Sequence, residues 1–314
     1  MNLLEIKDLF VDYTTKKSFT GREQTVHAVN GLSLSVNNGE ILSIAGESGC
    51  GKSTLAKAIM GLIPVKSGSI ILNGADLKNP AQYYKKIQMI FQNPYSSLNP
   101  KMRIKQILSE PLEINTNYSK QEIYKIIVEK IESVGLDSSI LNLYPHEFSG
   151  GQRQRIAIAR SLVLNPQIIV ADEPVSALDV SIQAQIINLI KSLKDNFNLT
   201  FLFISHDLSV IKYISDRIAV MYLGEIIEIG KTEEIFNNPK HPYTKALLSA
   251  VPELNSIEKR EIVKLEGELP SAENLPEGCK FHTRCPYMMH KCDKENPGTS
   301  EFSETHKCRC FLYP

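Results

Sequence analysis

The sequence predicts an α/β fold with a mainly parallel sheet, a helical insertion and a small C-terminal addition. Three observations predict this organisation. Short apolar strands alternate with helical patterns up to about residue 237, strand signals fade over about 95–165, and the residues after 240 become polar, proline-rich and rich in cysteine. We therefore predict one domain over residues 1–240, with its helical subdomain at about 95–165, and a C-terminal extension over 241–314.

The individual elements follow from local patterns. Apolar residues at helical spacing indicate a helix where strand signals are weak, and unbroken apolar runs indicate buried strands. The predicted elements are strands and turns over 4–36, a strand from Glu40 to Ala45, a helix from Ser53 to Leu62, a helix from Gln121 to Val134, a strand from Gln167 to Ala171, a helix from Ser181 to Asp195, a strand from Leu199 to Ile204 and a short helix from Thr244 to Ala250.

Composition excludes several classes of protein. The chain has 314 residues, with 35 basic and 35 acidic side chains, so its formal net charge is zero. This balance argues against a broad nucleic-acid-binding surface, and no nucleic acid is expected as a partner. No apolar run approaches the length that spans a membrane, and the first residues are too acidic for a signal peptide. We expect a cytosolic chain that reaches a membrane only through a partner.

A glycine-rich segment at residues 46–54 carries the first functional signal. It matches the pattern G-x-x-x-x-G-K-[ST] and lies between a predicted strand and a predicted helix. The glycines let backbone N–H groups point inward at phosphate oxygens, Lys52 adds a mobile charge for the β and γ phosphates, and Ser53 offers a hydroxyl to Mg²⁺. The predicted nucleotide-binding residues here are Gly46, Glu47, Ser48, Gly49, Cys50, Gly51, Lys52, Ser53 and Thr54, with Cys50 as a small loop filler rather than a nucleophile.

An acidic pair, Asp172 and Glu173, ends the apolar run that begins at Ile168. A carboxylate at Asp172 can hold Mg²⁺ through its water shell, because this ion loses its water reluctantly. Glu173, beside a γ-phosphate, can orient or deprotonate the attacking water. The alternative is a pair of solvated acids at the end of a strand.

Together with Phe148-Ser149-Gly150-Gly151-Gln152, these segments resemble the ATPase subunit of ATP-binding-cassette (ABC) transporters over residues 1 to about 250. The resemblance implies a P-loop NTPase cassette with a mixed core sheet, N-terminal antiparallel strands and a helical subdomain. It also implies that Ser149, Gly150, Gly151 and Gln152 bind the γ-phosphate held by a second cassette, so that ATP lies between Lys52 of one subunit and Ser149 of the other. Phe148 replaces the family's leucine and keeps an apolar anchor; alone, this short glycine pattern could be a loop in any protein.

Four further positions match the family. Gln92 resembles the glutamine that senses Mg²⁺ or water, so the implied Mg²⁺ site comprises Ser53, Gln92 and Asp172. His206 resembles the switch histidine that contacts the γ-phosphate, which gives Glu173, His206 and Gln92 as the implied catalytic set. Asp179 lies in a segment like the loop that crosses the dimer. Tyr13 is placed to stack on adenine, although Phe10 and Phe19 are nearby and any of the three can belong to the core.

Two stretches, residues 91–100 and 238–244, are similar to the ATPases of oligopeptide/dipeptide permeases, a group that includes nickel importers. Residues 172–185 look more like the F-type than the D-type of the two ATPases in such systems. The implied function is ATP hydrolysis that energises peptide uptake across the cytoplasmic membrane. The alternatives are nickel or another small solute, a non-transport ABC ATPase, and a regulatory module that hydrolyses little.

The resemblance also implies partners and a location. These are a second ABC ATPase subunit that forms a heterodimer with this chain, two integral membrane permease subunits and an extracytoplasmic substrate-binding protein. The chain would then lie peripherally on the cytoplasmic face of the cell membrane.

Five of the six cysteines lie within the last 36 residues, and in a reducing compartment such a cluster indicates a metal or redox site before disulfides. In the same permease group, four cysteines of the tail hold a [4Fe–4S] cluster, and the matching positions are Cys279, Cys285, Cys292 and Cys310, with Cys308 as the alternative fourth ligand. The competing interpretations are zinc bound with a histidine such as His306, and a tail of free thiols.

Overall fold

The computed structural model describes residues 2–16, 23–77, 83–250 and 267–313. The chain forms two compact units. Unit 1 comprises Met1–Val36, Ile41–Lys78 and Ser205–Pro314, and unit 2 comprises Asn37–Glu40 and Asn79–Ile204.

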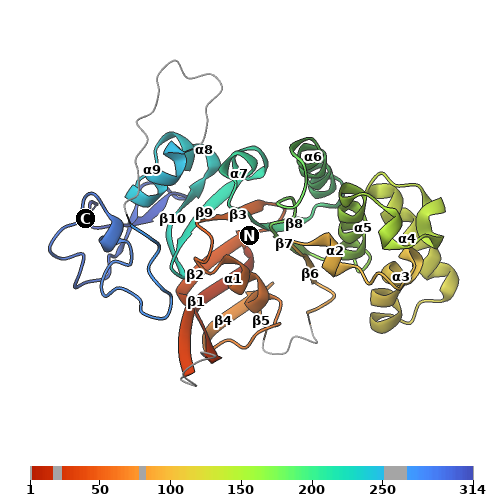
Figure 1. The fold of residues 1–314 in the computed structure, drawn as a ribbon, viewed down its shortest axis with the longest axis horizontal. Coiled ribbons are helices and arrows are strands. Elements are labelled where there is room, and N and C mark those ends of the chain that lie inside the picture. Colours follow the sequence, from red (N-terminus) through yellow and green to blue (C-terminus); the bar gives the residue numbers. More distant parts are fainter. Residues whose placement is uncertain (1, 17–22, 78–82, 251–266, 314) are drawn as a thin grey trace, which may run out of the picture. The chain divides into compact units, whose positions relative to one another are not determined.

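Unit 1 contains an antiparallel sheet near the N-terminus. Its strand order is β2-β1-β4-β5 (Figure 1), and Leu4 and Ile6 of the first strand lie opposite Leu72 and Ile70. These four side chains are buried, which explains the apolar alternation of the sequence. The strands are β1 (Asn2–Lys16), β2 (Glu23–Asn37), β4 (Ser67–Leu72) and β5 (Ala75–Asp76).

The N-terminal strands are longer than the strand-and-turn pattern of residues 4–36 suggests. Asp8 has a φ of 44° and the β1–β4 register shifts beside it, so β1 bulges here and continues. Gly31, inside β2, has a φ of 62° and lies under the ring of Phe10. Both distortions lie within strands, which therefore continue where the sequence pattern indicates shorter strands separated by turns.

The second sheet of unit 1 has the order β11-β12-β10-β9-β3. β3 runs parallel to β9 and β9 antiparallel to β10. The strand β12 pairs antiparallel with β10, and β11 pairs antiparallel with β12, so these two C-terminal strands extend the sheet. The strands are β3 (Ile41–Ala45), β9 (Arg217–Tyr222), β10 (Glu225–Lys231), β11 (Thr299–Glu301) and β12 (Lys307–Arg309); the helices of the unit are α1 (Lys52–Ile59), α7 (Leu208–Ile214), α8 (Thr232–Asn237) and α9 (Pro242–Ser249).

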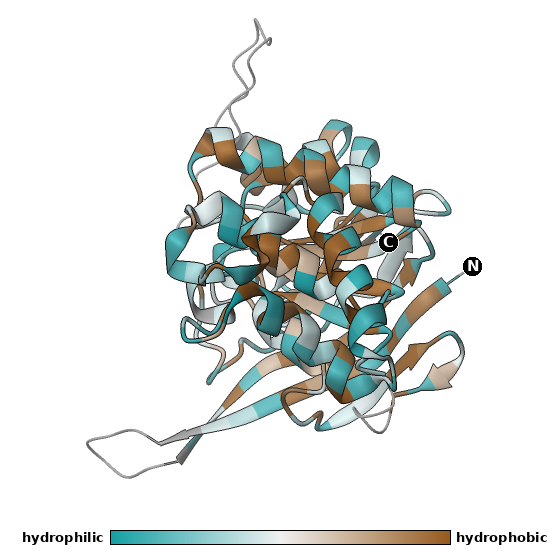
Figure 2. Ribbon diagram, turned by 90° about the vertical axis from the view of Figure 1, so that its right-hand side faces the viewer, coloured by the Kyte–Doolittle hydropathy of each residue, from teal (hydrophilic) through white to brown (hydrophobic). Residues whose placement is uncertain are grey.

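Unit 2 combines a small parallel sheet with a group of helices. β7 pairs in parallel with β6 on one side and β8 on the other, and all residues of β7 and β8 are buried. In Figure 1, α3, α4 and α5 gather at one end of the picture, and in Figure 2 the helices show brown and teal residues in alternation, as amphipathic helices do. The elements are β6 (Ile87–Ile90), α2 (Pro94–Ser97), α3 (Ile104–Asn115), α4 (Lys120–Ser133), α5 (Gly150–Leu162), β7 (Ile168–Asp172), α6 (Val180–Phe197) and β8 (Thr200–Ile204), with 3₁₀ turns at Ser138–Asn142 and Pro145–Glu147.

A buried histidine starts α9 and predicts acid sensitivity. His241 Nδ1 accepts a hydrogen bond of 3.1 Å from the N–H of Tyr243, and burial lowers the pKa of His241 to about 4. The unfolded chain takes up this proton near pH 6.5 and the folded chain does not, so stability falls as the pH drops from about 6.5 to about 4, by on the order of 2 kcal/mol at pH 5.

Thermal unfolding at pH 7 and pH 5 tests this expectation. His241→Asn keeps a capping side chain but removes the titrating ring, so this variant should lose less stability on acidification than the wild type. Equal losses in the two proteins would show that other groups cause the acid sensitivity.

Candidate nucleotide site and cysteine cluster

The glycine loop lies between β3 and α1, and its backbone is packed too closely for side chains at two positions. Gly46 has a φ of 157°, and a Cβ there would lie 2.4 Å from the carbonyl oxygen of Met221. Gly51 has a φ of 107°, and a Cβ there would lie 2.2 Å from the carbonyl oxygen of Ala28. Both contacts are far shorter than any real Cβ makes, so the loop requires glycine at these positions.

The loop curls around its own lysine. Lys52 is the first residue of α1 and is 5% exposed, and its Nζ donates to the carbonyl oxygens of Gly46 (2.7 Å) and Glu47 (2.8 Å). An ammonium group held at the N-terminal end of a helix, inside a ring of backbone groups, is suited to a phosphate. The residues of this loop therefore fit the triphosphate that the sequence predicts.

The remaining predicted residues of unit 1 lie on neighbouring elements. Cys50 is buried, and burial raises the pKa of its thiol, which suits a loop filler rather than a nucleophile. Tyr13 on β1 is 47% exposed, whereas the nearby ring of Phe10 covers Gly31; Phe19 lies outside the described residues. His206 is exposed and directly precedes Asp207, whose side chain caps α7.

In unit 2, two predicted catalytic side chains meet across 81 positions of sequence. Gln92 Nε2 donates a hydrogen bond of 2.8 Å to Glu173 Oε2. Glu173 follows β7 with a φ of 47°, and its N–H is held by the carbonyl oxygen of Ile204 at 2.9 Å. Asp172, at the end of β7, is 5% exposed. This geometry fixes the direction of the Glu173 carboxylate, as a residue that orients water requires.

The Ser149 segment caps its own helix. The hydroxyl of Ser149 accepts from the N–H of Gln152 (3.4 Å), and the Gln152 side chain accepts from the N–H of Ser149 (3.0 Å), so both residues start α5. Phe148 is buried, as expected of an apolar anchor. A Cβ on Gly151 would lie 2.6 Å from Cγ2 of Ile182 on α6, a helix that begins just after Asp179.

The thiol groups of four tail cysteines lie close enough to one another for their charges to interact. Burial raises the pKa of Cys279 to about 11, and Cys292, Cys310 and Cys285 each add to this rise. Cys285 is influenced in the same way by Cys310 and Cys292, and Cys310 by Cys292. The N–H of Cys279 also donates to the carbonyl oxygen of Cys292 at 2.8 Å. All six cysteines, each within a described range, are outside disulfides.

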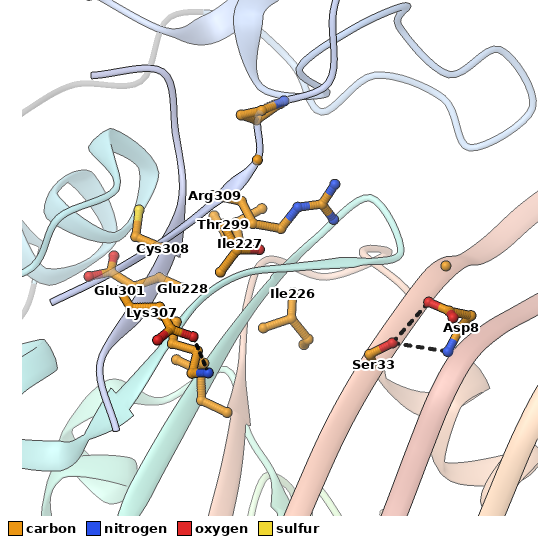
Figure 3. Close-up of a pocket in the computed structure, with 14 residues that line it drawn as sticks. Asp8, Ser33, Ile226, Ile227, Glu228, Thr299, Glu301, Lys307, Cys308 and Arg309 are labelled. Atoms are coloured by element: carbon orange, nitrogen blue, oxygen red, sulfur yellow. Dashed lines mark hydrogen bonds and ion pairs between the residues drawn. The ribbon is translucent and has the colours of Figure 1, made fainter. Parts of the chain in front are cut away.

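Cys308 has different surroundings. On β12 it lies directly opposite Glu228 of β10, and Figure 3 shows it beside this residue, with Arg309 extending to the other side. Burial, next the charge of Glu228, and then Cys310 and Cys279 raise the pKa of Cys308, so its thiolate is disfavoured. Glu228 is also the partner of His306, whose Nε2 lies 2.8 Å from Glu228 Oε1.

The pocket drawn in Figure 3 is separate from the phosphate loop. It has a volume of about 580 Å³ and is lined by strands of both sheets of unit 1, including Asp8, Ser33, Glu228 and Cys308. Within the described ranges, no three His, Cys, Asp or Glu side chains are grouped closely enough to hold a single metal ion. None of the described helices is both long and apolar enough to cross a membrane.

Two residues contact the phosphate loop although the sequence does not indicate that they do so. The hydroxyl of Tyr243 accepts from the N–H of Glu47 at 2.9 Å, and Arg284 Nη1 lies 3.0 Å from Glu47 Oε2. These residues are 196 and 237 positions away from Glu47, and no local pattern marks them as its partners.

Three features of the chain together indicate an ABC-type ATPase. They are a P-loop between a strand and a helix, an acidic pair at the end of a buried strand, and a helix that starts with serine and two glycines.

Comparison with known proteins agrees. The family model "ABC transporter" matches residues 29–176, and the model "Oligopeptide/dipeptide transporter, C-terminal region" matches residues 227–292. Among solved structures, cbiO1 from Clostridium perfringens is 26% identical with a TM-score of 0.65, covering 76% of this chain and 91% of that chain. The dimeric ATP-binding cassette MJ0796, bound to ADP and Pi, is 29% identical with a TM-score of 0.63, covering 73% and 98%.

Curated relatives match almost the whole chain. The oligopeptide transport ATP-binding protein AppF of Bacillus subtilis is 48% identical over 321 residues, covering 99% of this chain and 97% of AppF. The dipeptide transport ATP-binding protein DppF of Escherichia coli is 48% identical over 305 residues, covering 96% and 91%. The chain belongs to the family of oligopeptide/dipeptide transport ATP-binding proteins, and it is an ATP-hydrolysing subunit of an ABC transporter. The predicted cassette fold and ATPase activity are confirmed.

Proposed function

We propose that this ATPase energises the import of peptides. The observation that carries the proposal is full-length similarity to oligopeptide and dipeptide transport subunits, which includes the C-terminal region matched at residues 227–292. Vesicles that contain the assembled transporter should take up labelled dipeptides or oligopeptides only with ATP. ATP-dependent uptake of Ni²⁺ that excess peptide does not reduce would instead support the nickel alternative.

The proposed assembly has two cassettes and two integral membrane permease subunits, supplied by an extracytoplasmic substrate-binding protein. The second cassette is a different ATPase subunit, and the chain lies peripherally on the cytoplasmic face of the membrane. The exposed Ser149, which caps α5 beside partly exposed glycine N–H groups, supports a composite site, because such a helix start attracts the phosphate of an opposing nucleotide.

Within that site we assign roles by chemistry. Lys52 and the loop N–H groups bind the β and γ phosphates, and Tyr13 stacks on adenine. Glu173, oriented by Gln92, positions and activates the attacking water, and His206 stabilises charge on the transferred phosphoryl group. Ser53, Gln92 and Asp172 would hold Mg²⁺, which would supply positive charge to the phosphate oxygens. Asp179 lies in the segment proposed to meet the second cassette.

For the tail we propose a [4Fe–4S] cluster held by Cys279, Cys285, Cys292 and Cys310. The support is that these four thiols influence one another in every pairing, whereas Cys308, which interacts only with Cys279 and Cys310 among them, lies opposite Glu228. The wide spacing between Cys279, Cys285 and Cys292 does not suit a zinc knuckle built on C-x2-C pairs, whereas the ligands of a cluster need only converge as thiolates. The bound cluster would cross-link loops in a tail with little core of its own.

Two cysteine variants test this assignment. After anaerobic purification, the wild type and Cys308→Ser should be brown, absorb at about 400 nm and contain about four iron atoms per chain. Cys310→Ser should lose most of the iron, because one thiolate ligand is gone. The opposite pattern would make Cys308 the fourth ligand, and stoichiometric zinc without iron in the wild type would reject the cluster.

A further inference from the structure

The cysteine-bearing tail has a short loop, residues 279–285, that packs onto the core of unit 1. Cys279 begins the loop and Cys285 ends it, with a 3₁₀ turn at His282–Arg284 between them. Phe281 is buried, and its ring makes edge contacts with Tyr222 (centroids 5.3 Å apart) and a tilted contact with Tyr243 (5.5 Å). The loop is therefore anchored to unit 1 by an aromatic cluster.

That anchoring brings Arg284 to the phosphate loop. Arg284 Nη1 lies 3.0 Å from Glu47 Oε2 and 3.2 Å from Oε1, and the arginine side chain is only 8% exposed. Because the ion pair is largely shielded from water, its interaction is stronger than that of a surface pair. The backbone N–H of Glu47 is held at the same time by the hydroxyl of Tyr243.

Glu47, which is restrained in this way, also contacts Lys52. Its carbonyl oxygen accepts a 2.8 Å hydrogen bond from Lys52 Nζ, so all three polar groups of Glu47 are engaged: carboxylate with Arg284, N–H with Tyr243 and carbonyl with Lys52. The arginine also neutralises a carboxylate beside the place where a triphosphate would bind, and an unpaired carboxylate there would repel phosphate.

We propose that Arg284 is a positioning residue for nucleotide binding: through Glu47, and with Tyr243, the tail holds the phosphate loop and its lysine in the form that receives phosphate. This proposal rests on the nucleotide site proposed above. It gives the tail a role in the ATPase itself, because the loop that carries two of the cysteines also completes the support of the phosphate loop.

The test is a titration of the full-length chain with fluorescently labelled ADP and Mg²⁺, which requires no turnover. Arg284→Gln should raise the dissociation constant about tenfold, since a charge-assisted contact and a neutralising charge are both lost. Arg284→Lys, which keeps the charge, should recover most of the affinity. In the assembled transporter, Arg284→Gln should raise the KM for ATP and leave kcat unchanged, because Arg284 does not touch the reacting atoms.

A matched control is available on β12. Arg309 forms a 3.0 Å ion pair with Glu225 of β10, and like Arg284 it lies next to a cysteine and joins the tail to the core. Arg309→Gln should leave the affinity for labelled ADP unchanged. If Arg284→Gln misfolds, Tyr243→Phe tests the same support, because it removes only the hydroxyl that holds Glu47, and it should weaken binding about threefold.

Two results would overturn the proposal: wild-type affinity in Arg284→Gln (or in Tyr243→Phe, where Arg284→Gln misfolds), or equal weakening in Arg284→Gln and Arg309→Gln. Lys52→Ala separates this failure from failure of the nucleotide site. If Lys52→Ala loses binding while Arg284→Gln keeps it, only the positioning role is rejected. If Lys52→Ala binds normally, the proposed nucleotide site itself is wrong.

Discussion

Replacing Glu173 by glutamine should slow ATP hydrolysis by the assembled transporter at least about 100-fold while ATP binding persists. Glutamine is nearly isosteric, but it cannot accept a proton from water. The 2.8 Å hydrogen bond that Gln92 donates to Glu173 orients the carboxylate, so the substitution removes the proposed base with little change in the shape of the side chain. Phosphate release under saturating ATP measures the effect.

The control is Glu113→Gln, which changes an exposed glutamate of α3 in the same unit. This variant should hydrolyse ATP at the wild-type rate. Unchanged hydrolysis in Glu173→Gln would show that Glu173 does not activate the attacking water and that another group acts as the base.

Replacing Lys52 by alanine should weaken ATP binding by about 100-fold, which corresponds to about 3 kcal/mol. In the structure the Lys52 ammonium is buried and bonds the carbonyl oxygens of Gly46 and Glu47, so the alanine variant loses both the charge that phosphate needs and the group that closes the loop. Equilibrium binding of labelled ATP measures the loss.

Lys57→Ala is the matched control, because Lys57 is exposed and belongs to the same helix, α1. It should bind ATP as the wild type does. If both variants lose affinity equally, the effect comes from the general charge of the helix, and Lys52 has no special contact with phosphate.

Much of the site could be predicted because its chemistry is local in sequence. The phosphate loop needs glycines, a lysine and a serine in one short run between a strand and a helix, and the structure has β3 and α1 in those positions. The start of α5 is equally local, since Ser149 and Gln152 cap the helix that they begin. Patterns of this kind predict structure because neighbours in sequence make the contacts.

Contacts between distant segments could not be predicted in this way. The resemblance assigns Gln92 and Glu173 to one catalytic set but does not indicate the hydrogen bond between them, and nothing in the sequence pairs Glu47 with Arg284. The pairing of β12 with β10, which places Cys308 opposite Glu228, depends on strand register, and register is set by packing rather than by residue type. The sequence therefore left the choice between Cys308 and Cys310 open.

The central claim is that two cassettes complete each other's nucleotide site. It is tested most directly by vanadate, which replaces the γ-phosphate beside ADP and cuts nearby backbone under ultraviolet light. The assembled transporter should carry Lys52→Ala in this chain, so that vanadate is held only by the other cassette. We expect this chain still to be cut at Ser149 and not to be cut at residues 46–54. A Lys52→Ala chain that remains uncut at Ser149, while the wild-type chain is cut within its own loop, would contradict a shared site.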